Sequence, residues 1–356
     1  NRAGRAWLQS HPIATSVLYG TVASFPLFLA GAYAVRLQND LGASKSQFGW
    51  ALAAYFATAT LGSFQLGRQI DRRGTRFGGL VAAGGGSLAA LVAGAATSHW
   101  LTLGLALGIA GFSNTAGQLA GNRILASTVA TSRQGVGFGA KQSSVPLGSF
   151  LAGVVVASLG GGVPWRATFL GYAVVCALFI AVVPEFGGAT QHSNDPPARL
   201  GADRPSLLAL ALGGALFGSS GNALSVLLVD ALETDGINPR LAAAALAYGS
   251  LAAVIGRIGI GLFVDRRGGS GYRELTVVAA LGALGFAALA VADGSVVVLL
   301  IGVGLGFAAG WGWPAVIYLV VVRSSSAPPA TATGFVLTGV FFGAITGPPL
   351  FATIAE

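Results

Sequence analysis

Long apolar runs separated by short polar segments are the dominant pattern in this chain of 356 residues. A helix needs about 20 mostly apolar residues to cross the hydrocarbon core of a bilayer. The stretch 77–122 contains no Asp, Glu, Lys or Arg and is long enough for two such helices with a hairpin between them. The pattern predicts eleven membrane-spanning helices, at 14–36, 47–67, 77–96, 100–121, 135–158, 164–184, 206–229, 241–264, 273–292, 294–321 and 330–353.

One polar connection is much longer than the others. Residues 185–205 are rich in Pro, Asn, Asp and Ser, a composition typical of loops. We therefore expect a cytoplasmic linker at 185–205 between a six-helix bundle at 1–184 and a second bundle at 206–356.

Composition supports a membrane protein. Hydrophobic residues make up 54% of the chain and charged residues 9%, whereas soluble domains carry about 25% charged residues. The 55 glycines fit the same class, because small residues let transmembrane helices approach closely. The expected fold class is an all-α polytopic membrane protein.

The net charge of +8 would suggest a nucleic-acid partner in a soluble protein. Here the basic residues are distributed unequally between the two ends of the predicted spans. With the N-terminus in the cytoplasm, fourteen fall on the inner side and four on the outer side. This asymmetry is the positive-inside signal of a membrane protein. The charge therefore indicates topology, and we expect no nucleic-acid partner.

No catalytic or metal-binding constellation stands out in the sequence. The single cysteine, Cys176, excludes an intrachain disulfide, and the three histidines are scattered. We find no nucleophile–base set and no phosphate-binding loop. The sequence thus predicts neither an enzyme nor a cofactor.

The most specific feature is a repeated loop of the form G-x-x-x-D-R-R-G, which follows the second and the eighth predicted spans. The copies are 194 residues apart, which corresponds to one six-helix half, and internal repeats of this kind are common in transporters. The residues of interest are Gly67, Asp71, Arg72, Arg73, Gly74 and Arg76 in the first copy, and Gly261, Asp265, Arg266, Arg267 and Gly268 in the second.

The two aspartates of the repeat lie near helix ends among arginines. A carboxylate there can pair with Arg and with the positive N-terminus of the next helix, while Gly74 and Gly268 permit a tight turn. We interpret each loop as a conformational latch that holds helix ends together. The alternative is a solvated basic loop that only fixes topology.

With this motif, its repeat and its topology, the whole chain resembles the major facilitator superfamily. The resemblance implies twelve helices in two six-helix bundles related by pseudo-two-fold symmetry, with a substrate cavity that opens alternately to each side; we expect the twelfth helix beyond Glu356. Residues 139–148 and 311–314 resemble a bacterial branch associated with small organic anions. The fifth span lacks the complete G-x-x-x-G-P-x-x-G-G pattern of drug/proton antiporters, which makes that function less favoured.

Charged residues inside predicted spans are candidate substrate contacts, because a buried charge costs roughly 2.5–3.5 kcal/mol on insertion scales. Lys141 lies in the fifth span beside Gln142; the alternative is that its side chain extends to the cytoplasmic interface. Arg36 could bind substrate or pair with Asp40. Arg257 could bind substrate or belong to the second latch.

Neutral polar residues add to the candidate site. Asn114, Gln118 and Asn122 share one face of the fourth span. The resemblance implies that spans one, four, seven and ten line the cavity, although helix–helix hydrogen bonding would also explain such residues. The remaining candidates are Asn222, Tyr248, Trp313 and Tyr318.

The sign of the buried charges favours an anion. No Asp or Glu falls in the middle of a predicted span, whereas Lys141 and Arg257 do. We therefore expect a secondary transporter for a small organic anion, monomeric and in contact with membrane lipid, in a bacterial inner membrane. A drug/proton antiporter and a non-transporting receptor remain alternatives, and a coupling proton remains open.

Overall fold

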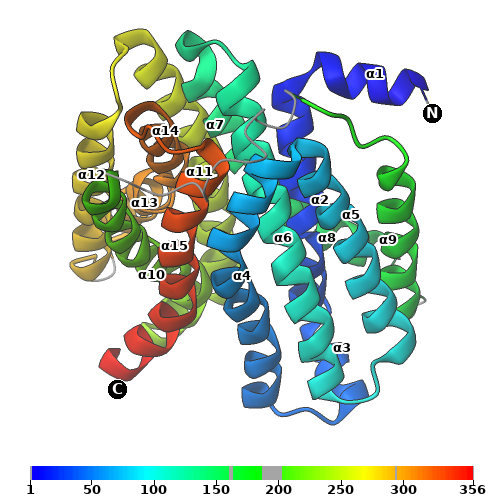
Figure 1. Ribbon diagram of the computed structural model, residues 1–356. Coiled ribbons are helices and arrows are strands. Elements are labelled where there is room, and N and C mark those ends of the chain that lie inside the picture. Colours follow the sequence, from blue (N-terminus) through cyan, green and yellow to red (C-terminus); the bar gives the residue numbers. More distant parts are fainter. Residues whose placement is uncertain (1, 160–162, 187–202, 293–294, 356) are drawn as a thin grey trace. The chain divides into compact units, whose positions relative to one another are not determined.

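The computed structural model describes residues 2–159, 163–186, 203–292 and 295–355, and every regular element within these ranges is a helix (Figure 1). The all-α prediction is confirmed for this part of the chain. Most of the predicted linker, residues 187–202, lies outside the described residues.

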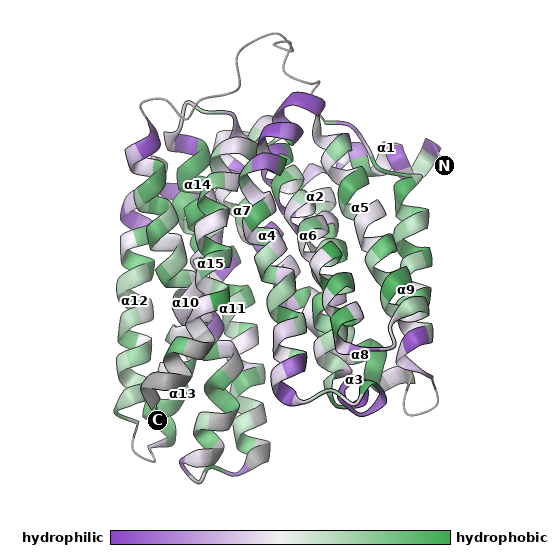
Figure 2. Ribbon diagram, turned by 60° about the horizontal axis from the view of Figure 1, so that its bottom comes forward, coloured by the Kyte–Doolittle hydropathy of each residue, from purple (hydrophilic) through white to green (hydrophobic). Residues whose placement is uncertain are grey.

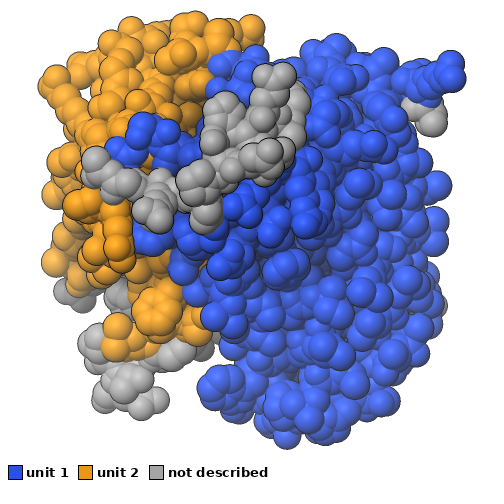
Figure 3. All heavy atoms as spheres, viewed as in Figure 1, with its two compact units in different colours: residues 1–129, 144–203, 326–338 blue, residues 130–143, 204–325, 339–356 orange. Residues whose placement is uncertain are grey.

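The chain forms two compact units, coloured separately in Figure 3. Unit 1 comprises Asn1–Val129, Ser144–Asp203 and Ser326–Thr338. Its elements are α1 (Arg2–Ser10), α2 (Pro12–Ala32), α3 (Ala34–Leu41), α4 (Lys45–Arg73), α5 (Thr75–Leu91), the π-helical turn Val92–Ala96, α6 (Trp100–Thr128), α8 (Ser144–Leu159), α9 (Trp165–Ile180) and the first part of α15 (Pro329–Ala355).

Unit 2 comprises Ala130–Ser143, Arg204–Ser325 and Gly339–Glu356. Its elements are the 3-10 turn Thr131–Arg133, α7 (Gln134–Gln142), α10 (Arg204–Thr234), α11 (Pro239–Arg267), α12 (Tyr272–Ala290), α13 (Val296–Leu305), the π-helical turn Gly306–Gly310, α14 (Pro314–Ser324) and the rest of α15. The predicted bundle boundaries remain predictions, and the two units draw the short segments 130–143 and 326–338 from the opposite sequence halves.

Seven helical segments within the described residues are long and apolar enough to cross a bilayer. Their surfaces expose large apolar side chains, such as Leu216 (75% exposed) and Val297 (67%), and Figure 2 shows hydrophilic residues concentrated toward helix ends. Water would disfavour such extensive apolar faces. The seven segments are Pro12–Ala32, Thr75–Ala96, Arg204–Ser225, Ala244–Arg267, Tyr272–Ala290, Val296–Ser324 and Pro329–Gly347. The count of eleven spans remains a prediction.

Glycines bring the helices of unit 1 into close contact. α4 packs along α6, where a Cβ atom at Gly111 would overlap the carbonyl oxygen of Tyr55. Thr58 donates its hydroxyl hydrogen bond across the same contact to the Gly108 carbonyl, at 2.7 Å. Close approach of this kind allows dispersion contacts and interhelical hydrogen bonds to stabilise helix pairs in a bilayer.

Several spans predicted as continuous helices are interrupted, among them 14–36, which divides at Tyr33 into α2 and α3. The span 135–158 divides at Ser143 into α7 and α8, and the span 294–321 passes through a π-helical turn and Trp311 before α14 begins at Pro314. Proline lacks a backbone N–H, so Pro146 cannot donate to the Gln142 carbonyl four residues earlier. The break therefore leaves that carbonyl available to another donor.

Candidate functional site

The first latch lies in unit 1, at the end of α4. The Asp71 carboxylate accepts hydrogen bonds from the backbone N–H groups of Ala330 (3.2 Å) and Thr331 (2.6 Å), and from the Thr331 hydroxyl (2.7 Å). These donors form the first turn of α15. Asp71 is only 4% exposed, so its negative charge acts on the positive end of α15 in a poorly hydrated site, where the interaction is strengthened.

A buried arginine completes the first latch. Arg123, near the end of α6, places its Nε 3.6 Å from the Asp71 carboxylate. Its guanidinium also donates to the Ile70 carbonyl. Arg123 thus ties the ends of α6 and α4 to the group that holds α15.

The second latch repeats this arrangement in unit 2, at the end of α11. The Asp265 carboxylate accepts hydrogen bonds from the N–H groups of Gly135 (2.7 Å) and Val136 (2.8 Å), which belong to the first turn of α7. Arg323, near the end of α14, donates to Asp265 at 3.0 Å and also to the Thr131 carbonyl. Each carboxylate therefore holds a helix that comes from the other half of the sequence.

The expectation that the next helix supplies the partner is wrong for both aspartates. α5 begins only two residues after α4 ends, and its first hydroxyl, that of Thr75, is engaged by Phe186: it accepts from the Phe186 N–H at 2.9 Å and donates to the Phe186 carbonyl at 3.1 Å. α12 begins at Tyr272, after a turn that contains three residues of positive φ, all glycines. The carboxylates reach distant helices because packing brings those helix starts closer.

The glycines of the repeat are of two kinds, those of the turn, as predicted, and those at helix contacts. Gly74 (φ 93°) and Gly268 (φ 70°) adopt left-handed conformations that favour glycine. A Cβ atom at Gly67 would overlap the Ala330 carbonyl oxygen, and one at Gly261 would overlap the Gly135 carbonyl oxygen. The first glycine of each copy thus permits the close helix contact that the aspartate then fixes.

The arginines within the repeat lie at the surface. Arg73 stacks over the Phe77 ring at 4.9 Å and Arg267 over the Phe263 ring at 4.6 Å. The predicted latches did not include Arg123 or Arg323. Each follows the end of a predicted span, at 100–121 and 294–321, and this matched position in the two halves was the available signal. The exposed arginines of the two copies are Arg72, Arg73, Arg76, Arg266 and Arg267.

A second candidate site lies in unit 2 around Lys141, near the end of α7. The Lys141 side chain is fully buried and donates from Nζ to the Gln142 side-chain oxygen at 2.9 Å. The ammonium also lies 5.7 Å from the centre of the Tyr318 ring. Lys141 therefore points into the protein interior instead of extending to the membrane surface.

Arg257 joins this site and not the second latch. Its Nη1 donates to the Gln142 carbonyl at 2.8 Å, and its Nη2 donates to the Trp311 carbonyl at 2.9 Å. The Gln142 carbonyl is the one to which Pro146 cannot donate a hydrogen bond. The guanidinium lies 4.8 Å from the Trp311 ring centre. Both acceptors occur where a helix is interrupted, and both are neutral. Trp311 was absent from the predicted site.

Nε of Arg257 and Nε1 of Trp313, both in unit 2, are buried donors without a hydrogen-bond partner among the described residues. Trp313 is 3% exposed and stacks on Phe217 at 5.3 Å between ring centres. Buried polar groups usually have partners. Both groups donate hydrogen bonds, and Trp313 follows Trp311, the residue whose carbonyl binds Arg257, by two positions. A ligand that accepts hydrogen bonds would satisfy such donors.

The polar face of α6 is buried in unit 1. Asn114, Gln118 and Asn122 are 4%, 6% and 1% exposed. Gln118 donates to Asn114 at 3.5 Å, and both amide atoms of Asn122 have no partner within the described residues. The amide group of Asn122 is therefore available for further hydrogen bonds.

Three other candidates have local contacts. Arg36 lies over the Tyr33 ring on the adjoining turn, at 5.7 Å. Asn222 donates to the Gly218 carbonyl of its own helix at 2.7 Å. Tyr248 is 43% exposed and its ring lies against α13. None of these contacts involves Lys141 or Arg257.

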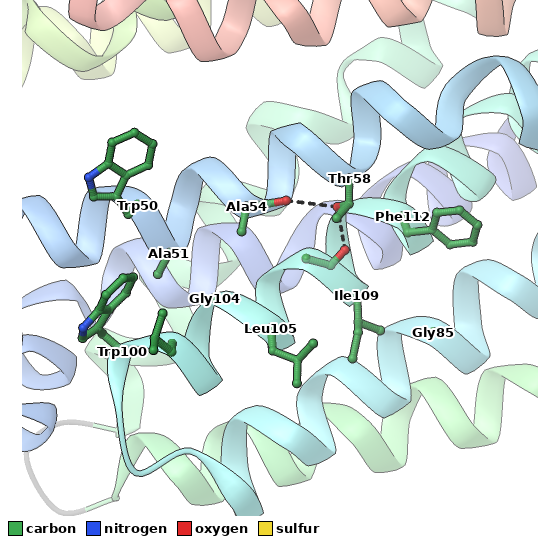
Figure 4. Close-up of a pocket in the computed structure, with 12 residues that line it drawn as sticks. Trp50, Ala51, Ala54, Thr58, Gly85, Trp100, Gly104, Leu105, Ile109 and Phe112 are labelled. Atoms are coloured by element: carbon green, nitrogen blue, oxygen red, sulfur yellow. Dashed lines mark hydrogen bonds between the residues drawn. The ribbon is translucent and has the colours of Figure 1, made fainter.

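Two cavities within single units are apolar. Figure 4 shows the one in unit 1, about 600 Å³ in volume, between α4 and α6. Its hydroxyl, that of Thr58, already donates to the Ala54 and Gly108 carbonyls. A cavity of about 490 Å³ in unit 2 is lined by residues of α10, α12 and α14 such as Phe217 and Leu275. Neither is lined by a candidate substrate residue, and neither suits an anion. Within the described ranges, no group of three or more His, Cys, Asp or Glu could hold a metal ion.

Comparison with known families decides the class of the protein. The family model of the Major Facilitator Superfamily matches residues 15–353. The chain belongs to this superfamily. No curated protein sequence matches the chain. The family and the apolar helices make this an integral membrane protein of the transporter class.

Solved structures of other superfamily members share the fold. The human organic anion transporter MFSD10 (TETRAN) is 17% identical, with a TM-score of 0.77, covering 97% of this chain and 93% of that one. The proton:xylose symporter XylE, bound to 6-bromo-6-deoxy-D-glucose, is 14% identical (TM-score 0.79; coverage 98% and 89%). The fucose:proton symporter FucP of E. coli is 14% identical (TM-score 0.73; coverage 97% and 93%). These identities show the fold alone.

Proposed function

We propose that this superfamily member is a secondary active transporter that moves a small organic anion by alternating access. The observation that carries the proposal is the meeting of two buried cations, Lys141 and Arg257, on the two oxygens of Gln142. Their exposed fractions are 0% and 2%. A cation in such surroundings is stabilised when a counter-charge offsets its lost hydration.

The chemistry of the site favours a carboxylate over a neutral or cationic solute. The hydrogen bonds from Arg257 go to neutral carbonyls, which leave its positive charge in place. Nε of Arg257 and Nε1 of Trp313 are further donors. A carboxylate accepts hydrogen bonds with both oxygens, and charge-assisted bonds are about twice as strong as neutral ones.

The interrupted helices connect binding to movement. Arg257 joins the break after α7 to the break before α14 through the Gln142 and Trp311 carbonyls. Binding sites in transporters are commonly formed by discontinuous helices. An anion that attracts the guanidinium would compete with these two bonds, so substrate occupancy would alter how the broken helices are held.

The latches supply the conformational control in this proposal. Asp71 and Asp265 each hold a helix start from the other sequence half. Both aspartates end helices beside arginine-rich loops, which we place in the cytoplasm of a bacterial cell by the positive-inside rule. We propose that the latches form in one state and release in the other. No mid-span carboxylate offers a proton site in the sequence, so a coupled proton would travel with the substrate.

Proteoliposome flux tests the proposal. We expect saturable uptake of a labelled carboxylate in a panel that also includes a neutral sugar and an organic cation, and competition by anions only. Protein-free liposomes are the control. Uptake of the sugar or the cation without any carboxylate would overturn the anion assignment. Anion binding without flux would instead indicate a receptor on this scaffold.

A further inference from the structure

Helix α1 is mostly exposed. Of its nine described residues only Leu8 is buried. Most of its surface is therefore open to surroundings other than the rest of unit 1.

The sequence of α1 divides the helix into two faces. At 100° per residue, Arg2, Arg5 and Gln9 lie within about 60° of one another, whereas Trp7 lies about 140–160° away from each of them. Ala3 is on the Trp7 side, within about 40° of it. The Trp7 side chain is 51% exposed. The helix thus carries a basic polar face and an opposite apolar face.

The polar face holds α1 against unit 1. Arg5 donates to the Ala181 carbonyl at 3.1 Å, just after the last turn of α9, and Gln9 donates to the Glu185 carbonyl at 2.9 Å. A cation at a helix C-terminus is favourable because of the helix dipole. These bonds fix the orientation of α1 and leave the side with Trp7 outward.

The position of α1 fits the membrane surface. Figure 1 shows α1 extending from the upper end of α2 over the upper end of α9, and in Figure 3 it projects from the surface of unit 1. It lies beside the first latch loop, because the side-chain carboxylate of Glu185 is 3.4 Å from the hydroxyl of Thr75, the first residue of α5. Arg72, Arg73 and Arg76 are exposed in this loop, so α1 is at the arginine-rich end of unit 1.

We propose that α1 is an in-plane helix that binds the anionic surface of the bilayer, with the Trp7 face at the boundary between headgroups and acyl chains and Arg2 on acidic headgroups. Trp is enriched at this interface and each basic residue near an anionic surface contributes about 1 kcal/mol. The acidic Glu185 lies beside α1, but it is outnumbered by the exposed arginines at this end of unit 1, which are Arg2, Arg5, Arg72, Arg73 and Arg76. The local charge therefore suits an acidic phospholipid. The inference is independent of the transported solute.

Spin labels on the whole chain in nanodiscs test this assignment. In a Cys176→Ala background, Ala3→Cys places a label on the Trp7 side and Gln9→Cys places one on the polar face, while Ser46→Cys, exposed at the start of α4, is the control. Accessibility to oxygen and to a water-soluble nickel chelate reports depth. We expect the label at residue 3 to be bilayer-inserted with phosphatidylglycerol present and the labels at residues 9 and 46 to face water.

The second test varies the charge of the helix and of the lipid. Arg2→Gln should reduce the ratio of inserted to water-exposed label at residue 3 about fivefold, which corresponds to about 1 kcal/mol for one basic residue. Equal insertion in phosphatidylcholine alone and with phosphatidylglycerol would overturn the anionic-lipid assignment. A label at residue 3 as accessible to nickel as the one at residue 46 would overturn the in-plane helix itself.

Discussion

Replacing Lys141 with Gln is expected to weaken binding and uptake of the transported anion by about tenfold to a hundredfold. The estimate follows from the value of hydrogen bonds to charged groups, about 1.5–3 kcal/mol. Gln retains a donor but removes the charge that a carboxylate would meet. Uptake kinetics in proteoliposomes and equilibrium affinity in detergent provide the measurement.

The chain offers a matched control, because its other lysine, Lys45, is exposed at the first turn of α4. Lys45→Gln should leave uptake unchanged. The thermal stability of Lys141→Gln should equal or exceed that of the unmodified protein, since replacing a buried charge removes its desolvation cost. Normal uptake by Lys141→Gln would contradict its role and make Arg257 the better candidate for the anion site.

Asp71→Asn is expected to slow transport at least about tenfold while leaving substrate affinity within about twofold. The substitution removes the charge that interacts with Arg123 and with the start of α15, and such buried, charge-assisted contacts contribute about 1.5–3 kcal/mol. The latch lies at a helix end, away from Lys141 in sequence and in its contacts. Maximal flux and equilibrium affinity must both be measured.

Two further aspartates provide a parallel variant and a control for this test. Asp265→Asn removes the equivalent charge of the second latch and should also reduce maximal flux. Asp235→Asn changes an exposed aspartate and should reduce neither quantity. If Asp71→Asn instead lost affinity and kept a normal maximal flux, Asp71 would be a binding residue and the latch interpretation would be wrong.

The sequence predicted features that depend on local patterns. The all-α class followed from apolar runs, and the repeat singled out Asp71 and Asp265, the two carboxylates that bind helix starts. Lys141 was singled out because a charge is rare within an apolar run. Each of these conclusions required only neighbouring residues or a simple interval, which a single sequence contains.

The parts that were missed depend on distant contacts. Asp71 meets Thr331, 260 residues away, and no local pattern specifies that partner. The sequence left Arg257 open between substrate binding and the second latch, and it did not predict the bond to the Gln142 carbonyl, because the effect of Pro146 on that carbonyl was not recognised. A proline four residues after a buried carbonyl is a readable signal, and it would have predicted an available acceptor at Gln142.

Helix α1 was missed for a different reason. A search for apolar runs passes over nine residues that include two arginines and a glutamine. Amphipathic spacing would have found it, since the polar and apolar residues separate at 100° per residue. Its docking through Arg5 to the Ala181 carbonyl could not be predicted, because α9 lies far along the chain.

Binding of a carboxylate compared with its primary amide tests the central claim most directly. The amide has nearly the same shape but no charge, so any difference in affinity reports recognition of the anion. With the best transported carboxylate, calorimetry on the unmodified protein should show at least about tenfold tighter binding than for the amide, and Lys141→Gln should remove most of that preference. Equal affinity of the unmodified protein for the acid and the amide would contradict an anion site at Lys141 and Arg257.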